Sequence, residues 1–194
     1  MIPSFLENKK KRVVIKEIED VKGKRFDNYR DEFDYLIQAG VTLEVKAISN
    51  PTFPLIESVG KNLIKLFFND VGLLTNVLYK NNIMAVLNDE NSVNLGSVYE
   101  SVVAQEFKAH GNNLFYYDNK AKGEVDYIID DYDNLCVLPV EVKSGKDYYV
   151  HTALNHFVTN DSYKINKAIV LSNEREVMTK DKIVYLPIYY VMFL

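Results

Sequence analysis

The sequence is poor in cysteine and has no long apolar run. Cys136 is the only cysteine, so neither an intramolecular disulfide nor a thiolate metal cluster can form within the chain. We expect Cys136 to be a buried strand residue. The longest apolar stretch, residues 183–194, is interrupted by Pro187 and is shorter than the roughly 20 residues that cross a bilayer. Because the N-terminus also lacks an apolar signal segment, we expect a cytoplasmic protein with no membrane partner.

The composition is that of a soluble globular protein. Of the 194 residues, 47% are hydrophobic and 26% are charged, which excludes disordered and fibrous classes. The net charge of −4 is unevenly spread, because residues 1–30 hold 9 Lys/Arg against 5 Asp/Glu and the remainder holds 14 against 22. The basic run at residues 9–12 could approach a polyanion such as nucleic acid, although a solvated loop has the same composition.

The first part of the chain reads as a small α+β segment. Apolar residues at helical spacing predict a helix over residues 25–40, with Gly40 at its C-terminal end. Residues 41–48 and 63–68 have strand patterns, and residues 69–88 are mostly helical in pattern. We predict a winged-helix-like unit and helical connector at 1–88, with a second domain at 89–194; the alternative is that the first segment is a structural connector only.

The second part opens with a helix over residues 96–107 that carries Glu100. Its apolar positions define one buried face, and Glu100 lies near the edge of that face. Ser97 and Glu100 also have the spacing of a capping box, in which the glutamate bonds the serine backbone N–H. The pattern therefore leaves Glu100 as either a helix cap or a site residue.

Three strands are then predicted at residues 114–117, 123–129 and 137–145. In the third, strict alternation places Glu141 and Lys143 on one face and the neighbouring valines on the other. In the second, alternation places Glu124 and Asp126 on one face, opposite Val125, so both are candidate carboxylates for one position. An exposed cross-strand ion pair has the same Glu-x-Lys pattern. Acidic side chains from a helix and two strands would, however, bind a hard divalent cation through oxygen.

This order of residues resembles the PD-(D/E)XK nuclease-like fold. Glu100 matches the acidic residue of its first helix, Asp126 that of its second strand, and Glu141-Val142-Lys143 its (D/E)-x-K element. Val125 stands where the motif has proline. The resemblance implies an α/β fold with a restriction-endonuclease-like mixed sheet flanked by helices.

A longer set of motifs resembles the uncharacterised C-terminal region, domain of unknown function 4143, of a prokaryotic AAA-type ATPase family. The matching motifs are Ile2-Pro3-Ser4-Phe5-Leu6, Ala39-Gly40, Asp70-Val71-Gly72-Leu73-Leu74, Tyr99-Glu100-Ser101-Val102-Val103-Ala104-Gln105-Glu106, Glu124-Val125-Asp126-Tyr127 and Glu141-Val142-Lys143-Ser144-Gly145. In that family a P-loop ATPase module precedes this region, so the resemblance implies such a module as a partner. The present sequence has no G-x-x-x-x-G-K-[S/T] motif, so we expect a fragment or a stand-alone relative without nucleotide binding.

The resemblance implies a metal-dependent phosphodiesterase acting on nucleic acid. Asp126 and Glu141, with the Val142 carbonyl, would bind Mg²⁺ or Mn²⁺, and Glu100 would hold a second ion or a water. Lys143 would orient or deprotonate the attacking water and stabilise charge on the phosphate. The alternative is a catalytically inactive module that uses the same fold to dock an ATPase, a protein or DNA.

The remaining candidates are the histidines and tyrosines. His110, His151 and His156 do not have the spacing of a metal site on one helical face, and we expect surface or packing roles for them. Residues 164–171 and 183–186 are predicted strands, and residues 189–193 a closing apolar segment. The tyrosines of that segment could stack on bases, but packing is the expected role for most of the 14 tyrosines.

Overall fold

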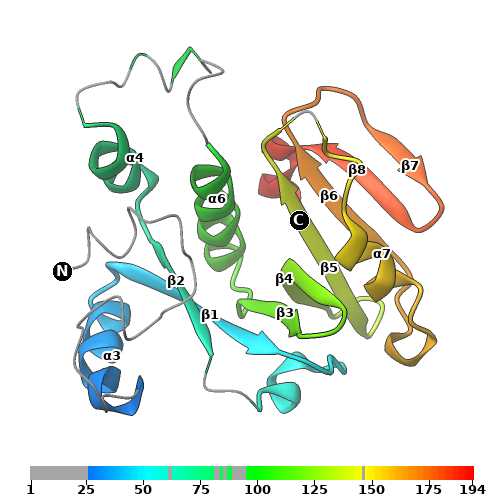
Figure 1. Ribbon diagram of the computed structural model, residues 1–194, viewed down its shortest axis with the longest axis horizontal. Coiled ribbons are helices and arrows are strands. Elements are labelled where there is room, and N and C mark those ends of the chain that lie inside the picture. The colour runs from blue at the N-terminus through cyan, green and yellow to red at the C-terminus, as the bar shows by residue number, and fades with distance from the viewer. Residues whose placement is uncertain (1–25, 61–62, 81–83, 85–86, 89–94, 146) are drawn as a thin grey trace.

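The computed structural model describes residues 26–60, 63–80, 84, 87–88, 95–145 and 147–194. These residues form an eight-stranded mixed sheet in the order β2-β1-β3-β4-β5-β6-β8-β7 (Figure 1). The predicted α/β class with a mixed sheet is thus confirmed. The strands are β1 (Thr42–Ile48), β2 (Ile64–Phe68), β3 (Phe115–Asn119), β4 (Gly123–Asp131), β5 (Cys136–Lys143), β6 (Ala168–Ser172), β7 (Met178–Lys180) and β8 (Ile183–Pro187).

The helices are short apart from one. The α-helices are α3 (Arg30–Gln38), α4 (Val71–Tyr79), α6 (Gly96–Ala109) and α7 (Thr152–Val158). The 3-10 helices are η1 (Phe26–Tyr29), η2 (Leu55–Ser58), η3 (Asp161–Tyr163) and η4 (Ile188–Phe193). The predicted closing apolar segment is therefore η4.

The strands before and after residue 88 belong to the same sheet. β1 pairs with β2 in antiparallel register and with β3 in parallel register, from Lys46↔Phe115 to Ile48↔Tyr117. The predicted order of a helix followed by two strands in the first segment is confirmed by α3, β1 and β2. Residues 89–94, beside the predicted boundary, and the basic run at 9–12 lie outside the described residues.

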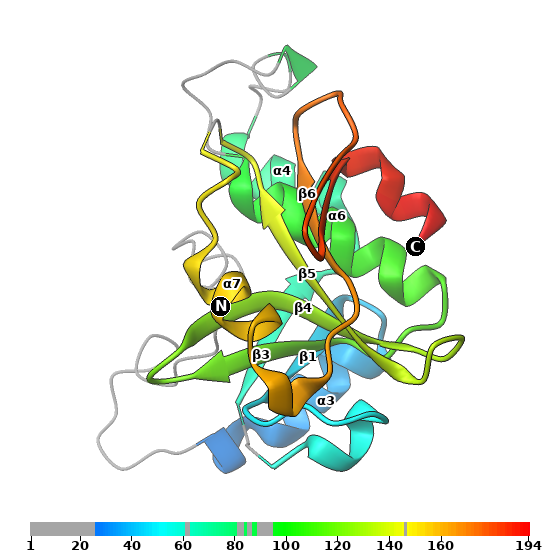
Figure 2. The ribbon, with the colours of Figure 1, turned by 90° about the vertical axis from the view of Figure 1, so that its right-hand side faces the viewer.

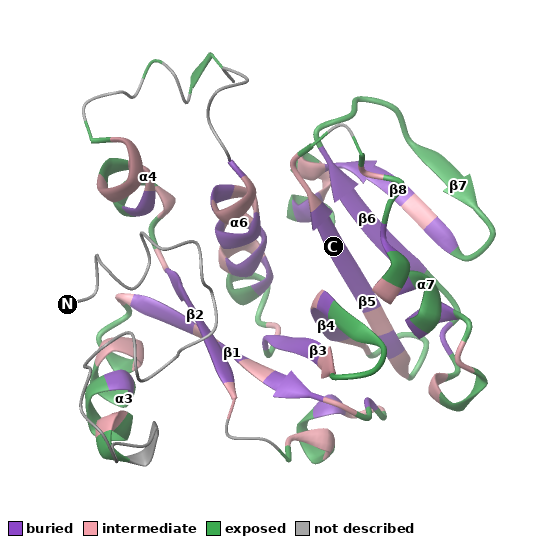
Figure 3. Ribbon diagram, viewed as in Figure 1, coloured by how far each residue is buried: buried purple, intermediate pink, exposed green. Residues whose placement is uncertain are grey.

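The two faces of the sheet bury separate cores. One core holds Val103, Ala104 and Phe107 of α6 together with Val140 and Val142 of β5 and Val191 of η4. The other holds Leu154, Phe157 and Val158 of α7 together with Val137, Val170 and Tyr185. We call these the α6 face and the α7 face; α6 and α7 lie on opposite sides of the strands (Figure 2). The central strands β5 and β6 are largely buried, whereas β7 at the edge is exposed (Figure 3).

Local sequence explains how the helices begin and end. Gly40 has a φ of 69°, the left-handed conformation expected just after a helix, and follows the C-cap Ala39 of α3. The Asp70 side chain accepts hydrogen bonds from the N–H groups of Gly72 and Leu73, capping α4.

The N-cap of α6 is Leu95 and no side chain caps it, so Ser97 lies inside the helix. The capping-box interpretation of Ser97 and Glu100 is therefore wrong.

The later strands follow the prediction with shifted bounds. β6 begins at Ala168 rather than at residue 164, and β7 and α7 have no counterpart in the prediction. Cys136 is the first residue of β5 but is only half-buried, because it lies next to the exposed turn between β4 and β5. The prediction that Cys136 is buried is wrong.

Gly123 lets α7 approach the beginning of β4. Its φ is 94°, and a Cβ built there would lie 2.9 Å from the Cβ of Ala153 in α7. A larger residue at this position would be both strained and crowded.

Within the described ranges, no helix is long and apolar enough to span a membrane.

Candidate functional site

A β-bulge in β4 lies at Asp126. β3 pairs Phe115 with Ile128 and Tyr117 with Val125, so three steps along β4 match two steps along β3. Val125 consequently belongs to the core of the α7 face, although Tyr127, two residues later, belongs to that of the α6 face. Bulges interrupt the alternation of side chains and occur next to functional sites. The predicted uninterrupted alternation around Val125 is therefore wrong.

The bulge brings the Asp126 side chain to the backbone of β5. Asp126 Oδ2 accepts a hydrogen bond of 2.9 Å from the N–H of Val142. The regular pairing of β4 with β5 ends at Tyr127↔Val140, so this side chain bonds β5 just beyond the ladder. Asp126 is thereby held against the strand segment that carries Glu141 and Lys143.

Glu141 and Lys143 form an ion pair on the α7 face. Lys143 Nζ lies 2.8 Å from Glu141 Oε1, and the exposed fractions of the two side chains are 28% and 8%. The neighbouring Val140 and Val142 lie in the core of the α6 face, so alternation places Glu141 and Lys143 on the opposite side. The predicted arrangement of the third strand is confirmed.

Burial and a like charge perturb Glu141. Desolvation, followed by the negative charge of Asp126, raises the pKa of Glu141 to about 7, although Lys143 acts in the opposite direction. Glu141 Oε2 is buried and has no hydrogen-bond partner in the described part of the chain. Two neighbouring carboxylates with such an oxygen atom form a site that a cation would stabilise.

Glu124, the other candidate in β4, has a different partner. Its Oε1 forms an ion pair with Lys65 Nζ of β2. The Lys65 side chain is only 3% exposed, and its Nζ also lies 4.4 Å from the ring centroid of Tyr116, a residue of the core on the α6 face. Glu124 and Asp126 do not share one face, contrary to the prediction, because the bulge separates them.

Glu100 lies in α6 and is buried, with 6% exposure. The backbone carbonyl of Glu100 accepts a hydrogen bond of 2.8 Å from the buried hydroxyl of Tyr127, which fixes α6 on the sheet one residue from Asp126. Among the described residues, no three His, Cys, Asp or Glu side chains are grouped closely enough to hold a metal ion. The structure thus brings together Asp126, Glu141 and Lys143, but does not join Glu100 to them in one group of ligands.

The donors present fit a cation bound by two carboxylates. Carboxylate oxygen is the ligand that Mg²⁺ and Mn²⁺ prefer, and Mg²⁺ is commonly bound through one or two carboxylates while it keeps several waters. Asp126 and Glu141 supply such a pair, and the Glu141 oxygen without a partner would gain a ligand role. A closed cage of protein ligands is not needed for this kind of site.

His151 lies close enough to the site for the charge of Lys143 to influence it. His151 precedes α7, is 5% exposed, and its Nε2 lies 2.8 Å from the hydroxyl of Tyr185. Burial lowers its pKa, and the charge of Lys143 contributes in the same direction. The expected packing role of His151 is confirmed, and His156 is exposed as expected for a surface residue. His110 is also exposed, and its Nδ1 lies 2.7 Å from the carbonyl oxygen of Leu194.

Comparison with known families identifies the second half of the chain. The model of a domain of unknown function, DUF4143, matches residues 95–191. The chain belongs to the DUF4143 family. The matched region runs from the start of α6 into η4 and includes all four predicted site residues, whereas β1 and β2, which complete the DUF4143 sheet, come before it. No curated protein and no solved structure matches the chain.

Proposed function

We propose that this chain is a nuclease-like module with a divalent-metal-dependent phosphodiesterase site formed by Asp126, Glu141 and Lys143. The observation that carries the proposal is the hydrogen bond from Val142 N–H to Asp126, which holds two acidic side chains and one lysine together on the neighbouring strands β4 and β5. A scaffold has little need for a pair of neighbouring carboxylates in which burial, and then the charge of Asp126, raises the pKa of Glu141. The resemblance to the PD-(D/E)XK nuclease-like fold agrees with this set of residues.

Each side chain has a separate role in the proposed chemistry. Asp126 and Glu141 would hold Mg²⁺ or Mn²⁺, which supplies Lewis-acid polarisation of a phosphate oxygen. Lys143, an ammonium beside the buried carboxylate, would orient the attacking water and stabilise negative charge that develops on the phosphate. Glu100 lies in α6, on the other face of the sheet, so a role for it as a further ligand would require α6 or the strand end to move when a substrate binds.

The proposed substrate is a nucleic acid, and the proposed partner is a P-loop ATPase module of the family that the sequence resembles.

Lys143 must exchange its bond with Glu141 for one with the phosphate or the water. A cation bound to Glu141 would favour this exchange by neutralising the carboxylate.

Cleavage assays with matched variants test the proposal. The purified protein is incubated with Mn²⁺ and labelled single-stranded, branched and linear DNA or RNA. Asp126→Asn, Glu141→Gln and Lys143→Ala should each lower the cleavage rate by about a hundredfold or more, because each removes a ligand or a charge at the reacting phosphate. Asp133→Asn, in the exposed turn between β4 and β5, is the control and should cleave normally. Unchanged turnover in Lys143→Ala would contradict the assignment.

A non-catalytic docking module is the second candidate. It is favoured by the direct ion pair of Lys143 with Glu141 and by the net charge of −8 on residues 31–194, where 14 Lys/Arg face 22 Asp/Glu. In that case the protein would bind an ATPase module or DNA without metal-dependent turnover. Binding that is unaffected by Asp126→Asn and Glu141→Gln, with no cleavage by the wild type, would support this function instead.

A further inference from the structure

Tyr185 lies in the same row of the sheet as Glu141. Glu141 pairs with Val170 of β6, and Val170 pairs with Tyr185 of β8. Paired residues on neighbouring strands point to the same face, so both side chains are on the α7 face. Two strand spacings separate them, roughly 10 Å. An aromatic side chain therefore lies within about one or two nucleotides of the carboxylate pair.

Three tyrosines gather at this point, and we call Tyr148, Tyr149 and Tyr185 the tyrosine cluster. The ring centroids of Tyr148 and Tyr149 are 3.9 Å apart, those of Tyr149 and Tyr185 5.4 Å, and those of Tyr148 and Tyr185 6.0 Å. The hydroxyl of Tyr148 donates a hydrogen bond to that of Tyr149. Two of the rings come from the loop that directly follows the Glu-x-Lys strand.

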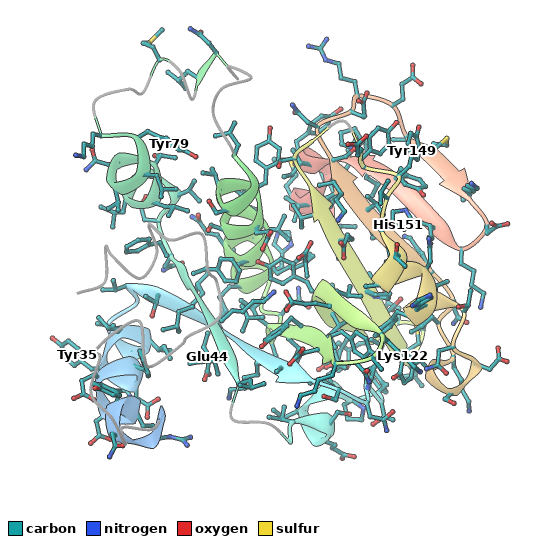
Figure 4. All side chains as sticks on the ribbon, in the orientation of Figure 1. Tyr35, Glu44, Tyr79, Lys122, Tyr149 and His151 are labelled. Carbon is teal, nitrogen blue, oxygen red and sulfur yellow. The ribbon has the colours of Figure 1, made fainter. Side chains whose placement is uncertain are left out.

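One ring of the tyrosine cluster, Tyr185, is buried, and another, Tyr149, is exposed to solvent. Tyr185 is 4% exposed and His151 is 5% exposed, with His151 Nε2 2.8 Å from the Tyr185 hydroxyl. Tyr149 is 51% exposed and lies near His151 on the side of α7 and β8 (Figure 4). An aromatic side chain that is half exposed yet supported from below by other rings is preorganised for stacking, because little rotamer freedom remains to be lost.

We propose that Tyr149 stacks on an unpaired nucleobase, so that a single-stranded segment of nucleic acid passes between the tyrosine cluster and Lys143. Every base has a face that stacks on an aromatic ring, whereas the faces of paired bases in a duplex are covered by their neighbours. The inference deepens the proposed function, on which it rests, by naming an unpaired strand as the substrate class.

The charges around the cluster agree with contact through bases rather than phosphates. Glu174 and Glu176 lie close enough to influence Tyr148, so phosphates would be repelled there. On the side of His151, Lys143 and Lys180 contribute positive charge. The phosphate backbone would accordingly follow the lysines, while a base turns toward the tyrosines.

The first experiment measures binding of fluorescein-labelled oligothymidine by anisotropy in EDTA, where metal-dependent turnover cannot consume the probe. Tyr149→Ala should raise the Kd roughly tenfold, and Tyr149→Phe, which keeps the ring, should remain near wild type. Tyr132→Ala is the matched control. Tyr132 is 65% exposed but lies in the turn at the opposite end of β5, and its removal should leave the Kd unchanged. The same substitutions should have little effect on a blunt duplex.

A second measurement reports on stacking itself. The sequence contains no tryptophan, so Tyr149→Trp introduces a single tryptophan, whose emission can be excited at longer wavelength than that of the tyrosines. Oligothymidine should quench its emission, and should not quench that of Tyr132→Trp. An unchanged Kd in Tyr149→Ala, or no quenching in Tyr149→Trp, would overturn the inference. Because both readouts are independent of cleavage, a protein that binds through Tyr149 but never cleaves would refute the phosphodiesterase while leaving the stacking site in place. Conversely, cleavage that is unchanged in Tyr149→Ala would refute the stacking site while leaving the phosphodiesterase in place.

Discussion

The side chain of Asp126 accepts a hydrogen bond from the backbone N–H of Val142, the residue between Glu141 and Lys143. One bond therefore ties the bulge of β4 to the Glu-x-Lys segment of β5. Burial raises the pKa of Glu141, and the charge of Asp126, which this bond holds nearby, acts in the same direction. The candidate site is thus a local electrostatic conflict that a divalent cation would relieve.

Metal binding should depend on both carboxylates. We expect calorimetric titration of Mn²⁺ to show saturable binding in the wild type and a loss of at least about tenfold in affinity in Asp126→Asn and in Glu141→Gln, since each removes a charged oxygen ligand. Asp133→Asn, an exposed change in the turn between β4 and β5, should bind as the wild type does. Equal affinities in all four proteins would show that the ion binds elsewhere.

Glu141 should make stability depend on pH in metal-free protein. Its pKa rises from an ordinary 4.5 to about 7 in the folded state, so the unfolded chain loses this proton at a lower pH than the folded protein does. Ionisation therefore lowers the free energy of unfolding as the pH rises from about 4.5 to 7, by about 3 kcal/mol at most. Glu141→Gln should be more stable than the wild type above about pH 7, and this advantage should disappear near pH 4.5.

Urea denaturation in EDTA at several pH values measures this difference. The exposed Glu57→Gln is the control and should show no comparable trend. A Glu141→Gln variant that is less stable than the wild type at all pH values would mean that the ion pair with Lys143 outweighs desolvation of the carboxylate.

Lys65 and Glu124 should be energetically coupled. Lys65 is buried, with a side chain 3% exposed, whereas Glu124 is 40% exposed. Glu124→Gln leaves the ammonium buried without its carboxylate, and we expect a loss of about 1–2 kcal/mol in the free energy of unfolding. In Lys65→Met, the further change Glu124→Gln should cost almost nothing. A double-mutant cycle by denaturant unfolding measures the coupling, and strictly additive effects would contradict it.

Tyr127 should fix α6 to the sheet. Its hydroxyl donates to the backbone carbonyl of Glu100 at 2.8 Å inside the core. Tyr127→Phe should therefore lower the free energy of unfolding by about 1 kcal/mol and increase amide hydrogen exchange in the first turns of α6. Tyr35→Phe, at a position 72% exposed, should have no such effect. Exchange rates in α6 that do not change in Tyr127→Phe would show that the bond does not hold the helix.

Local patterns in the sequence predicted most of the secondary structure. Helical spacing located α6, two-residue alternation located β1 and β5, and a mostly apolar strand-like run located β2. Alternation also placed Glu141 and Lys143 together, since a regular strand fixes that relation by itself. The pattern failed at β4, where an extra residue at Asp126 has no signature in the local sequence.

The sequence by itself determined the acidic and basic residues available, the strand that carries Glu141 and Lys143, and the single cysteine that rules out a disulfide within the chain. Only the tertiary structure decided which carboxylates meet. Lys65 of β2 pairs with Glu124 of β4, three places along the sheet, and the bulge turns Asp126 toward Val142. It also brought Tyr185 into the row of Glu141. These relations depend on strand order and register, which arise from contacts between residues distant in the chain and are therefore invisible to local periodicity.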